Sequence, residues 1–143
     1  FKGMRSKGNN ELHVTSTHYD DQIALDLVRG SQRTVAIHGC EGNESVAYIG
    51  GSDDRLIELI TESLEDIGIS VREAPHHISG TQENNIVNMT QTQGGVQLEL
   101  TAQLRKELFK NRKSSRKNRE NKDNWDDLMY DFADAMKKAI ERA

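Results

Sequence analysis

Short apolar runs alternate along the chain with stretches in which apolar residues recur at helical spacing. The apolar runs predict strands over residues 12–17, 34–38, 46–51, 69–74 and 95–100. Helical spacing predicts a short helix after Asp20 and Asp21, a longer one after Asp53 or Asp54, one over 101–109 and a last one over 124–142. Strands that alternate with helices predict an α/β fold in which a mixed sheet is flanked by helices.

Three of the predicted helices have a defined apolar face. The first is expected to pack through Ile23, Leu27 and Val28. The second carries Leu56, Ile57, Ile60, Leu64 and Ile67, and Gly68 stands where a helix commonly ends. The last face is formed by Trp125, Leu128, Met129, Phe132, Met136 and Ile140.

The length allows one domain, residues 1–143, and is too short for two. Hydrophobic residues make up 34% and charged residues 29% of the chain, which is little apolar material for a sheet covered on both faces. The chain opens with Phe1, and no leader or helix cap is recognisable before FKGMRSKGNN. We therefore expect the chain to begin inside a domain and to lack that domain's N-terminal strands.

Charge is distributed unevenly along the sequence. Residues 106–122 contain eight Lys or Arg and two Glu, a net charge of +6, while the remainder carries −10. Few apolar residues follow Phe109 in this stretch, so 110–123 is predicted to be a solvated, mobile loop. It could attract a polyanion by long-range steering, or it could have no binding function.

Several partner classes have no support in the composition. The net charge of −4 gives no reason to expect nucleic acid. No apolar run approaches the roughly 20 residues that span a bilayer, so no membrane partner is expected. The single cysteine, Cys40, excludes an internal disulfide and a CxxC metal site. We expect a soluble monomer, and the sequence leaves the compartment open.

Two residues at strand ends are candidates for chemistry. His38 ends an apolar run before Gly39, and an imidazole fixed there could bind zinc or could simply be a hydrogen-bonded, buried histidine. Glu99 lies in GVQLEL, on the strand face that it shares with Gln97. A buried carboxylate there could act as a general base, whereas an edge strand would leave both side chains in water.

Other polar residues are weaker candidates. His18 could face a site or only cap a helix. Asn85 and Asn88 could bind a substrate carbonyl or carboxylate, although asparagine more often serves in turns. His13 is expected to be structural, and His76 and His77 to be exposed. The histidines have no HExxH or HxH spacing, so a metal site would need ligands from distant segments.

Several segments in order resemble one known family. They are GNNELHVTSTHYDD (8–21), AIHGCEG (36–42), YIGG (48–51), NNIVN (84–88) and GVQLEL (95–100). In this order and at these spacings they are similar to the phage-borne and bacterial poly-γ-glutamate hydrolases. The resemblance covers residue 1 to about residue 109 and continues loosely through the last helix.

The resemblance implies a zinc carboxypeptidase-like fold with one zinc ion. AIHG matches the family's S-x-H-G strand end, which makes His38 the third protein ligand of the ion. The glutamate of VQLE matches the family's general base, which would be Glu99. The implied reaction is hydrolysis of γ-glutamyl amide bonds in poly-γ-glutamate, and Arg105 and the basic loop are candidates for contact with this polyanion by their charge.

Two departures from the family pattern leave alternatives open. The family's other two ligands, in an upstream H-x-G-G-x-x-E segment, are absent from these 143 residues. Met89 stands where the family often has an arginine after N-I-x-N. The same chemistry on short γ-linked or cell-wall peptides is therefore an alternative, as is a non-catalytic module that binds polyanions.

Overall fold

Four strands form one mixed sheet in the computed structural model, which describes residues 8–143. Their bounds are Val35–Cys40 (β1), Val46–Gly51 (β2), Ser70–Glu73 (β3) and Val96–Thr101 (β4). The spatial order is β1-β4-β2-β3, and β4 runs parallel to β1 but antiparallel to β2, which in turn is parallel to β3. The predicted α/β fold with a mixed sheet is confirmed. Residues 1–7 of the predicted domain lie outside the described residues.

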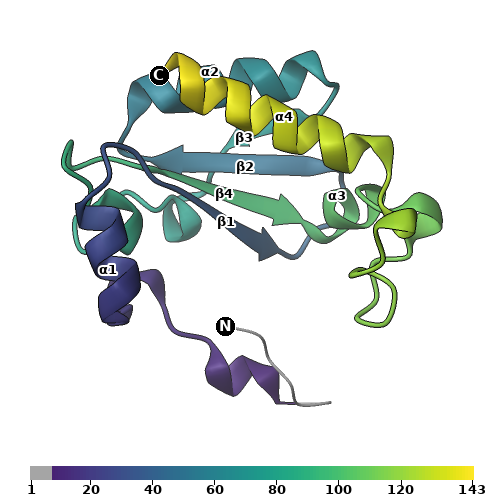
Figure 1. The fold of residues 1–143 in the computed structure, drawn as a ribbon, viewed down its shortest axis with the longest axis horizontal. Helices are drawn as coiled ribbons and strands as arrows, with labels where there is room; N and C mark the ends of the chain where they lie inside the picture. The colour runs from purple at the N-terminus through teal and green to yellow at the C-terminus, as the bar shows by residue number, and fades with distance from the viewer. Residues whose placement is uncertain (1–7) are drawn as a thin grey trace.

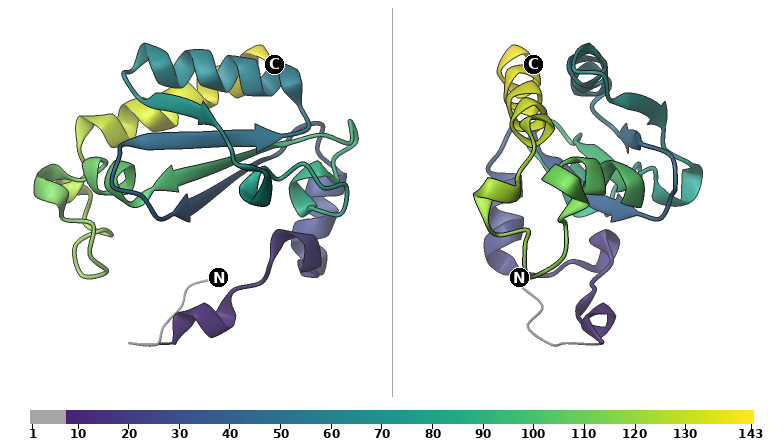
Figure 2. Two further views of the ribbon diagram at one scale, coloured as in Figure 1. Left: turned by 180° about the vertical axis from the view of Figure 1, so that it is seen from behind. Right: turned by 90° about the vertical axis from the view of Figure 1, so that its right-hand side faces the viewer.

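Helices lie on both sides of this sheet. They span Gln22–Arg29 (α1), Asp54–Asp66 (α2), Ala102–Glu107 (α3) and Asp127–Arg142 (α4). Each begins after a side chain that accepts a hydrogen bond from a backbone N–H of the first turn, namely Asp21, Asp53, Thr101 and Asp126. The two long helices α2 and α4 pack against each other above the sheet, while α1 and the N-terminal segment lie below it (Figures 1 and 2).

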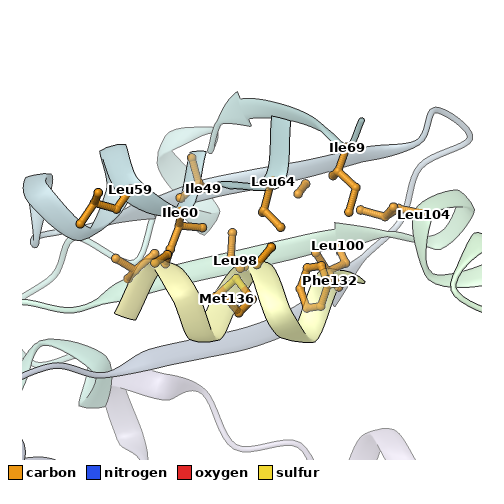
Figure 3. Close-up of a cluster of buried hydrophobic side chains, with 14 of the residues drawn as sticks. Ile49, Leu59, Ile60, Leu64, Ile69, Leu98, Leu100, Leu104, Phe132 and Met136 are labelled. Carbon is orange, nitrogen blue, oxygen red and sulfur yellow. The ribbon is translucent and has the colours of Figure 1, made fainter. Parts of the chain in front are cut away.

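The hydrophobic core fills the space between the sheet and the α2–α4 pair (Figure 3). The central strand β4 contributes Val96, Leu98 and Leu100 to it, and Phe132 and Met136 of α4 pack into the same cluster. Because side chains alternate along a strand, Gln97, Glu99 and Thr101 occupy the opposite face of β4. One face of the sheet is therefore apolar and covered by helices, and the other carries the polar residues.

The strand β1 is at the edge of the sheet, whereas its apolar sequence is typical of a buried strand. Its side chains alternate between half-buried and exposed, and Ile37 is 55% exposed. A short apolar run fits an edge as well as a centre, because the pattern contains no information about which strands pair. The prediction of a strand here is confirmed, and its predicted burial is wrong.

Residues 12–17 do not form the predicted strand. They lie in an irregular segment between the 3₁₀ turns Asn9–Leu12 and Ser16–His18. Leu12 and Val14 are exposed, and the segment pairs with no strand of the described chain. β-Branched residues favour a strand only where a neighbouring strand and a packed face are available, and neither is present for this segment.

The first helix also packs differently from its prediction. Ile23 and Leu27 are 74% and 68% exposed, while Ala24, Leu25 and Val28 are partly buried. The helix contacts the 3₁₀ turn Ile86–Asn88, and its partly buried side is the one that carries Ala24, Leu25 and Val28. The predicted inner face was therefore wrong for two of its three residues.

The basic segment connects α3 to α4 at one end of the sheet (Figure 1). It contains the 3₁₀ turns Lys110–Arg112 and Lys122–Asn124, and its predicted mobility stays a prediction. A bridge between Phe109 and Trp125 brings its two ends together. Trp125 is extended, so α4 begins after it rather than at residue 124.

Candidate active site

His38 of β1 and Glu99 of β4 are direct partners in the parallel pairing of these strands. Partners in register on adjacent strands project to the same side of the sheet. Both side chains therefore share the polar face. The sheet brings together the two residues for which the sequence predicted chemistry.

Both residues line a hollow of ≈ 240 Å³ on this face. The N-terminal segment forms one wall of the hollow and the loop after β3 forms another. The lining residues are His13, Thr15, Ser16, Thr17, His38, His77, Ile78, Gly80, Gln82, Asn85, Gln97 and Glu99. The hollow therefore combines three imidazoles and one carboxylate with several hydroxyl and amide groups.

The carboxylate of Glu99 is in a partly desolvated position. The residue is only 7% exposed, and this burial raises the pKa of its carboxyl above the ordinary value. The charge of His38, a hydrogen bond from Gln97 and the charge of Arg105 all act in the opposite direction and lower this pKa. A carboxylate whose pKa is raised is a stronger base than an ordinary glutamate, which suits a group that accepts a proton.

A chain of buried amides leads to Glu99. Asn85 donates from Nδ2 to Oε1 of Gln97 over 3.2 Å, and Gln97 donates from Nε2 to Oε1 of Glu99 over 3.3 Å. The same Nε2 atom also donates to the carbonyl oxygen of Ile78 over 3.1 Å. Oδ1 of Asn85 accepts from the N–H of Val87, which fixes which way its amide points. Gln97 therefore presents an N–H to the carboxylate.

Gly80 makes room for this chain. It has a φ of +66°, and a Cβ at this position would lie 2.8 Å from Cβ of Gln97. The backbone of the loop can therefore approach the Gln97 side chain only because the residue is glycine.

Arg105 lies beside the carboxyl end of β1. Its guanidinium donates to the carbonyl oxygens of Leu100 (3.2 Å) and Cys40 (3.0 Å). A Cβ at Gly39 would lie 2.8 Å from Cζ of Arg105, so this glycine provides space for the guanidinium. The charge of Arg105 lowers the pKa of Glu99, but the Arg105 side chain does not line the hollow.

The other residues predicted to bind substrate differ in whether they line the hollow. Asn85 lines the hollow, whereas Asn88 and His18 do not. The Asn88 amide donates to the carbonyl oxygens of Gly80 and Gln82, and its Oδ1 accepts from the N–H of Gly95. These bonds give Asn88 a structural task, in which it ties the loop to the start of β4. His18 is exposed at the end of a 3₁₀ turn.

Sequence reasoning missed four residues around this site. Tyr48 of β2 is the register partner of Glu99 on the other side of β4, and Arg72 of β3 is the partner of Tyr48. A row of His38, Glu99, Tyr48 and Arg72 therefore crosses the polar face. His13 and His77, expected to be structural and exposed respectively, both line the hollow. The pairing of the strands identifies Tyr48 and Arg72, and the paths of the N-terminal segment and of the loop after β3 identify His13 and His77; none of these is visible in the sequence.

The hollow provides too few donors for a complete zinc site. Within residues 8–143, no group of three or more His, Cys, Asp or Glu side chains is arranged to hold a metal ion. His38 is suited to act as one ligand, and zinc usually takes three or four protein ligands. The described part of the chain also has no helix that is both long and apolar enough to cross a membrane.

Comparison with known proteins gives consistent matches. The family model of poly-gamma-glutamate hydrolase matches residues 1–135. The SPbeta prophage-derived UPF0714 protein YoqZ of Bacillus subtilis (strain 168) is 37% identical over 111 residues, which covers 76% of this chain and 40% of that protein. The UPF0714 protein YmaC of the same strain is 32% identical over 149 residues, which covers 99% of this chain and 60% of that protein.

Two solved structures share the fold closely. The structure of a bacteriophage poly-gamma-glutamate hydrolase has a TM-score of 0.91 and 32% identity, covering 99% of this chain and 67% of that one. A zinc-free, apo structure of YndL has a TM-score of 0.88 and 28% identity, covering 98% and 68%. The chain thus spans 40% and 60% of the lengths of YoqZ and YmaC. Because the family model matches nearly the whole sequence, this chain belongs to the poly-γ-glutamate hydrolase family, whose name points to hydrolase activity.

Proposed function

We propose that this chain contributes His38 and Glu99 to a zinc-dependent hydrolase of γ-glutamyl amide bonds, with poly-γ-glutamate as substrate. The main support is the register pairing of these two residues at a polar hollow. Family membership supports the hydrolase activity, and the zinc-free description of a solved relative supports the choice of metal.

His38 serves as one zinc ligand in this proposal, and the other ligands come from residues outside this sequence. When bound, zinc supplies Lewis acidity that polarises a carbonyl and lowers the pKa of a water molecule towards about 7. Glu99 accepts the proton of the attacking water and transfers it to the nitrogen of the leaving amine. The raised pKa of its carboxyl suits both steps, because the group must take up and release a proton.

Gln97 and Asn85 act as positioning residues for Glu99. The bond from Nε2 of Gln97 holds one carboxylate oxygen, which leaves the other oxygen available for the attacking water. Asn85 in turn holds the Gln97 amide through its oxygen. A hydrogen-bonded, buried network of this kind restricts the rotation of the catalytic side chain before substrate binds.

Arg105 is the proposed contact for a substrate carboxylate. Two carbonyl acceptors orient its guanidinium, and its remaining N–H groups, which form no hydrogen bond within residues 8–143, can bind an anion. Asn88 and His18 have no direct contact in this proposal, because the Asn88 amide is held by the carbonyls of Gly80 and Gln82 and His18 is exposed away from the hollow.

The decisive experiment uses the complete gene product that carries these residues. Purified protein is incubated with poly-γ-glutamate, and new amino groups and polymer length are measured with zinc, with a chelator, and with zinc restored. We expect zinc-dependent shortening of the polymer. Metal-independent cleavage would contradict the proposed role of zinc, and an intact polymer would contradict the proposed substrate.

Short γ-linked peptides are the second candidate substrate. The residue that favours them is Met89, because the resemblance to the family implies an arginine at this position. A comparison of kcat/KM for the polymer and for a γ-glutamyl dipeptide separates the two. A preference for the dipeptide would favour the second candidate.

A further inference from the structure

A second hollow, of ≈ 260 Å³, lies between α3 and the basic segment. Its lining residues are Ala102, Arg105, Lys106, Leu108, Phe109, Ser114 and Arg119. Three of these are cations, and no acidic residue lines the hollow. We call it the basic pocket.

The cations of the basic pocket form no salt bridge within the described part of the chain. Within residues 8–143, neither Arg105, Lys106 nor Arg119 forms an ion pair with a carboxylate. The neighbouring acid Glu107 is engaged elsewhere, with the Ser45 hydroxyl and the Gln103 amide. The charge of Arg105 acts in part on Glu99, whereas Lys106 and Arg119 are paired with no carboxylate among residues 8–143. An incoming anion would therefore meet two cations whose charge is not already compensated, with Arg105 beside them.

The walls of the basic pocket are held in place by contacts of their own. The Nε1–H of Trp125 donates to the carbonyl oxygen of Arg119 over 2.8 Å, and the N–H of Asp126 donates to the carbonyl oxygen of Leu108 over 3.0 Å. The ammonium group of Lys122 lies 5.5 Å from the centre of the Trp125 ring. These contacts fix the backbone at Arg119 against Trp125, which directly precedes the N-cap residue of α4.

Arg105 connects the basic pocket to the catalytic hollow. Its guanidinium packs against Gly39, the residue after His38, while the same side chain lines the basic pocket. A polymer that reaches Glu99 therefore has Arg105 beside it and two more cations beyond.

We propose that Arg105, Lys106 and Arg119 form a carboxylate-binding subsite for substrate residues beyond the bond that is cleaved. A γ-amide linkage leaves one α-carboxylate free on every residue, so a γ-linked polymer presents a regular series of anions. Arg105 binds the carboxylate nearest the reaction, and Lys106 and Arg119 bind a following one. This role rests on the proposed γ-glutamyl hydrolase function, and it makes the enzyme prefer a polymer over a dipeptide.

The test compares Lys106→Gln/Arg119→Gln with a matched control, Lys138→Gln, in the complete gene product. Lys138 is an exposed cation of α4 that does not line the basic pocket. For exposed ion pairs we expect a loss of about threefold per cation and about tenfold together. The ratio of kcat/KM for the polymer to kcat/KM for a γ-glutamyl dipeptide should fall by that factor in the double variant, and less so at high salt.

Two outcomes would overturn the subsite: an unchanged ratio in the double variant, or an equal fall in Lys138→Gln. The conservative variant Lys106→Arg/Arg119→Lys keeps both charges and should keep the polymer preference, which distinguishes lost charge from a disturbed loop.

Direct binding keeps the subsite separate from the proposed reaction. Titration calorimetry of poly-γ-glutamate into the Glu99→Gln protein measures affinity without turnover. Weaker binding after the two additional Gln substitutions supports the subsite, and equal binding overturns it. If the parent enzyme cleaves no γ-glutamyl bond at all, the proposed function fails, and the same titration still decides whether the basic pocket holds the polyanion.

Discussion

His38 and Glu99 stand opposite each other in the β1–β4 pairing, although they are far apart in the sequence. Neither residue has a local motif that defines its role. Because both side chains lie on the polar face, His38 can bind a metal ion at the same site at which Glu99 accepts a proton. The predictions below test the two residues and the side chains that hold them.

Replacement of Glu99 by Gln should abolish most of the activity and leave metal binding intact. The substitution removes the group that exchanges the proton, and general bases typically contribute 10²–10⁴-fold. We therefore expect kcat for γ-glutamyl hydrolysis to fall by about 10²–10⁴-fold. Steady-state kinetics and zinc analysis of the same sample provide the measurement. Full activity in this variant would remove Glu99 from the mechanism.

Replacement of His38 by Ala should weaken zinc binding. The loss of a side chain that only hydrogen-bonds to a metal ligand typically costs about 10–100-fold in metal affinity, and the loss of a direct ligand should cost at least that much. Competition with a fluorescent chelator gives the affinity. The control is His76→Ala, because His76 lies in the same part of the fold but does not line the hollow. Equal zinc affinity in the two variants would exclude His38 as a ligand.

Replacement of Gln97 by Met should lower kcat about tenfold with a smaller change in KM. Methionine fills a similar volume but cannot donate to Glu99 or to the Ile78 carbonyl. The unpaired groups should also lower the free energy of unfolding by about 1–3 kcal/mol.

A double-mutant cycle separates positioning of Glu99 from general stability. In the Glu99→Gln background, Gln97→Met should cost little further activity, because the group that it positions is already gone. Gln91→Met is the matched control, since the Gln91 amide bonds only to the carbonyl of Gly30, outside the hollow. Independent, multiplicative losses in the cycle would argue against the positioning role.

Replacement of Gly39 by Ala should displace Arg105. The new Cβ would lie 2.8 Å from Cζ of that side chain, which is flexible and can move at low cost. We expect a small change in thermal stability and a rise in KM for the polymer of about threefold. In an Arg105→Gln background the same substitution should have no additional effect. A further rise there would show that Gly39 acts through another neighbour.

The stability of the metal-free protein should depend on the ionisation of Glu99. Burial raises the pKa of this carboxyl above the ordinary value of 4.5, so the folded state holds the proton more tightly than the unfolded state. This contribution to stability is complete below pH 4.5 and is lost as the pH rises through the raised pKa. Relative to wild type, Glu99→Gln should therefore gain stability between pH 4.5 and pH 7. Urea denaturation at both pH values measures this gain, and the opposite trend would contradict it.

The sequence predicted the long helices and all four strands of the sheet, because their patterns depend on local physics. The helix cap at Asp53 and the glycine after α2 are visible in the sequence, and α2 ends where Gly68 adopts a φ of +82°. The same approach failed for residues 12–17, whose β-branched residues find no strand to pair with in the described chain. It also failed for Ile23 and Leu27, since helical spacing alone cannot say which neighbour a face will meet.

The candidate site was only partly predictable for a related reason. Alternation in GVQLEL placed Gln97 and Glu99 on one face but could not distinguish a water-exposed edge from a buried centre. The strand order decides this, because β4 lies between β1 and β2. The same order brings Tyr48 beside Glu99. The basic stretch was visible as charge, whereas its pocket depends on how Trp125 and Phe109 close the loop.

The parallel pairing of β1 with β4 has a consequence for how the protein folds. The pairing joins segments about 60 residues apart, and closing so long a stretch of chain carries an entropic cost that must be met before any contact is gained. Parallel, non-local pairings of this kind form slowly compared with helices. Assembly of the imidazole and the carboxylate is therefore linked to the late, high-contact-order steps of folding. A partly folded chain that already contains α2 and α4 would be inactive, because β1 and β4 would not yet have brought His38 and Glu99 together.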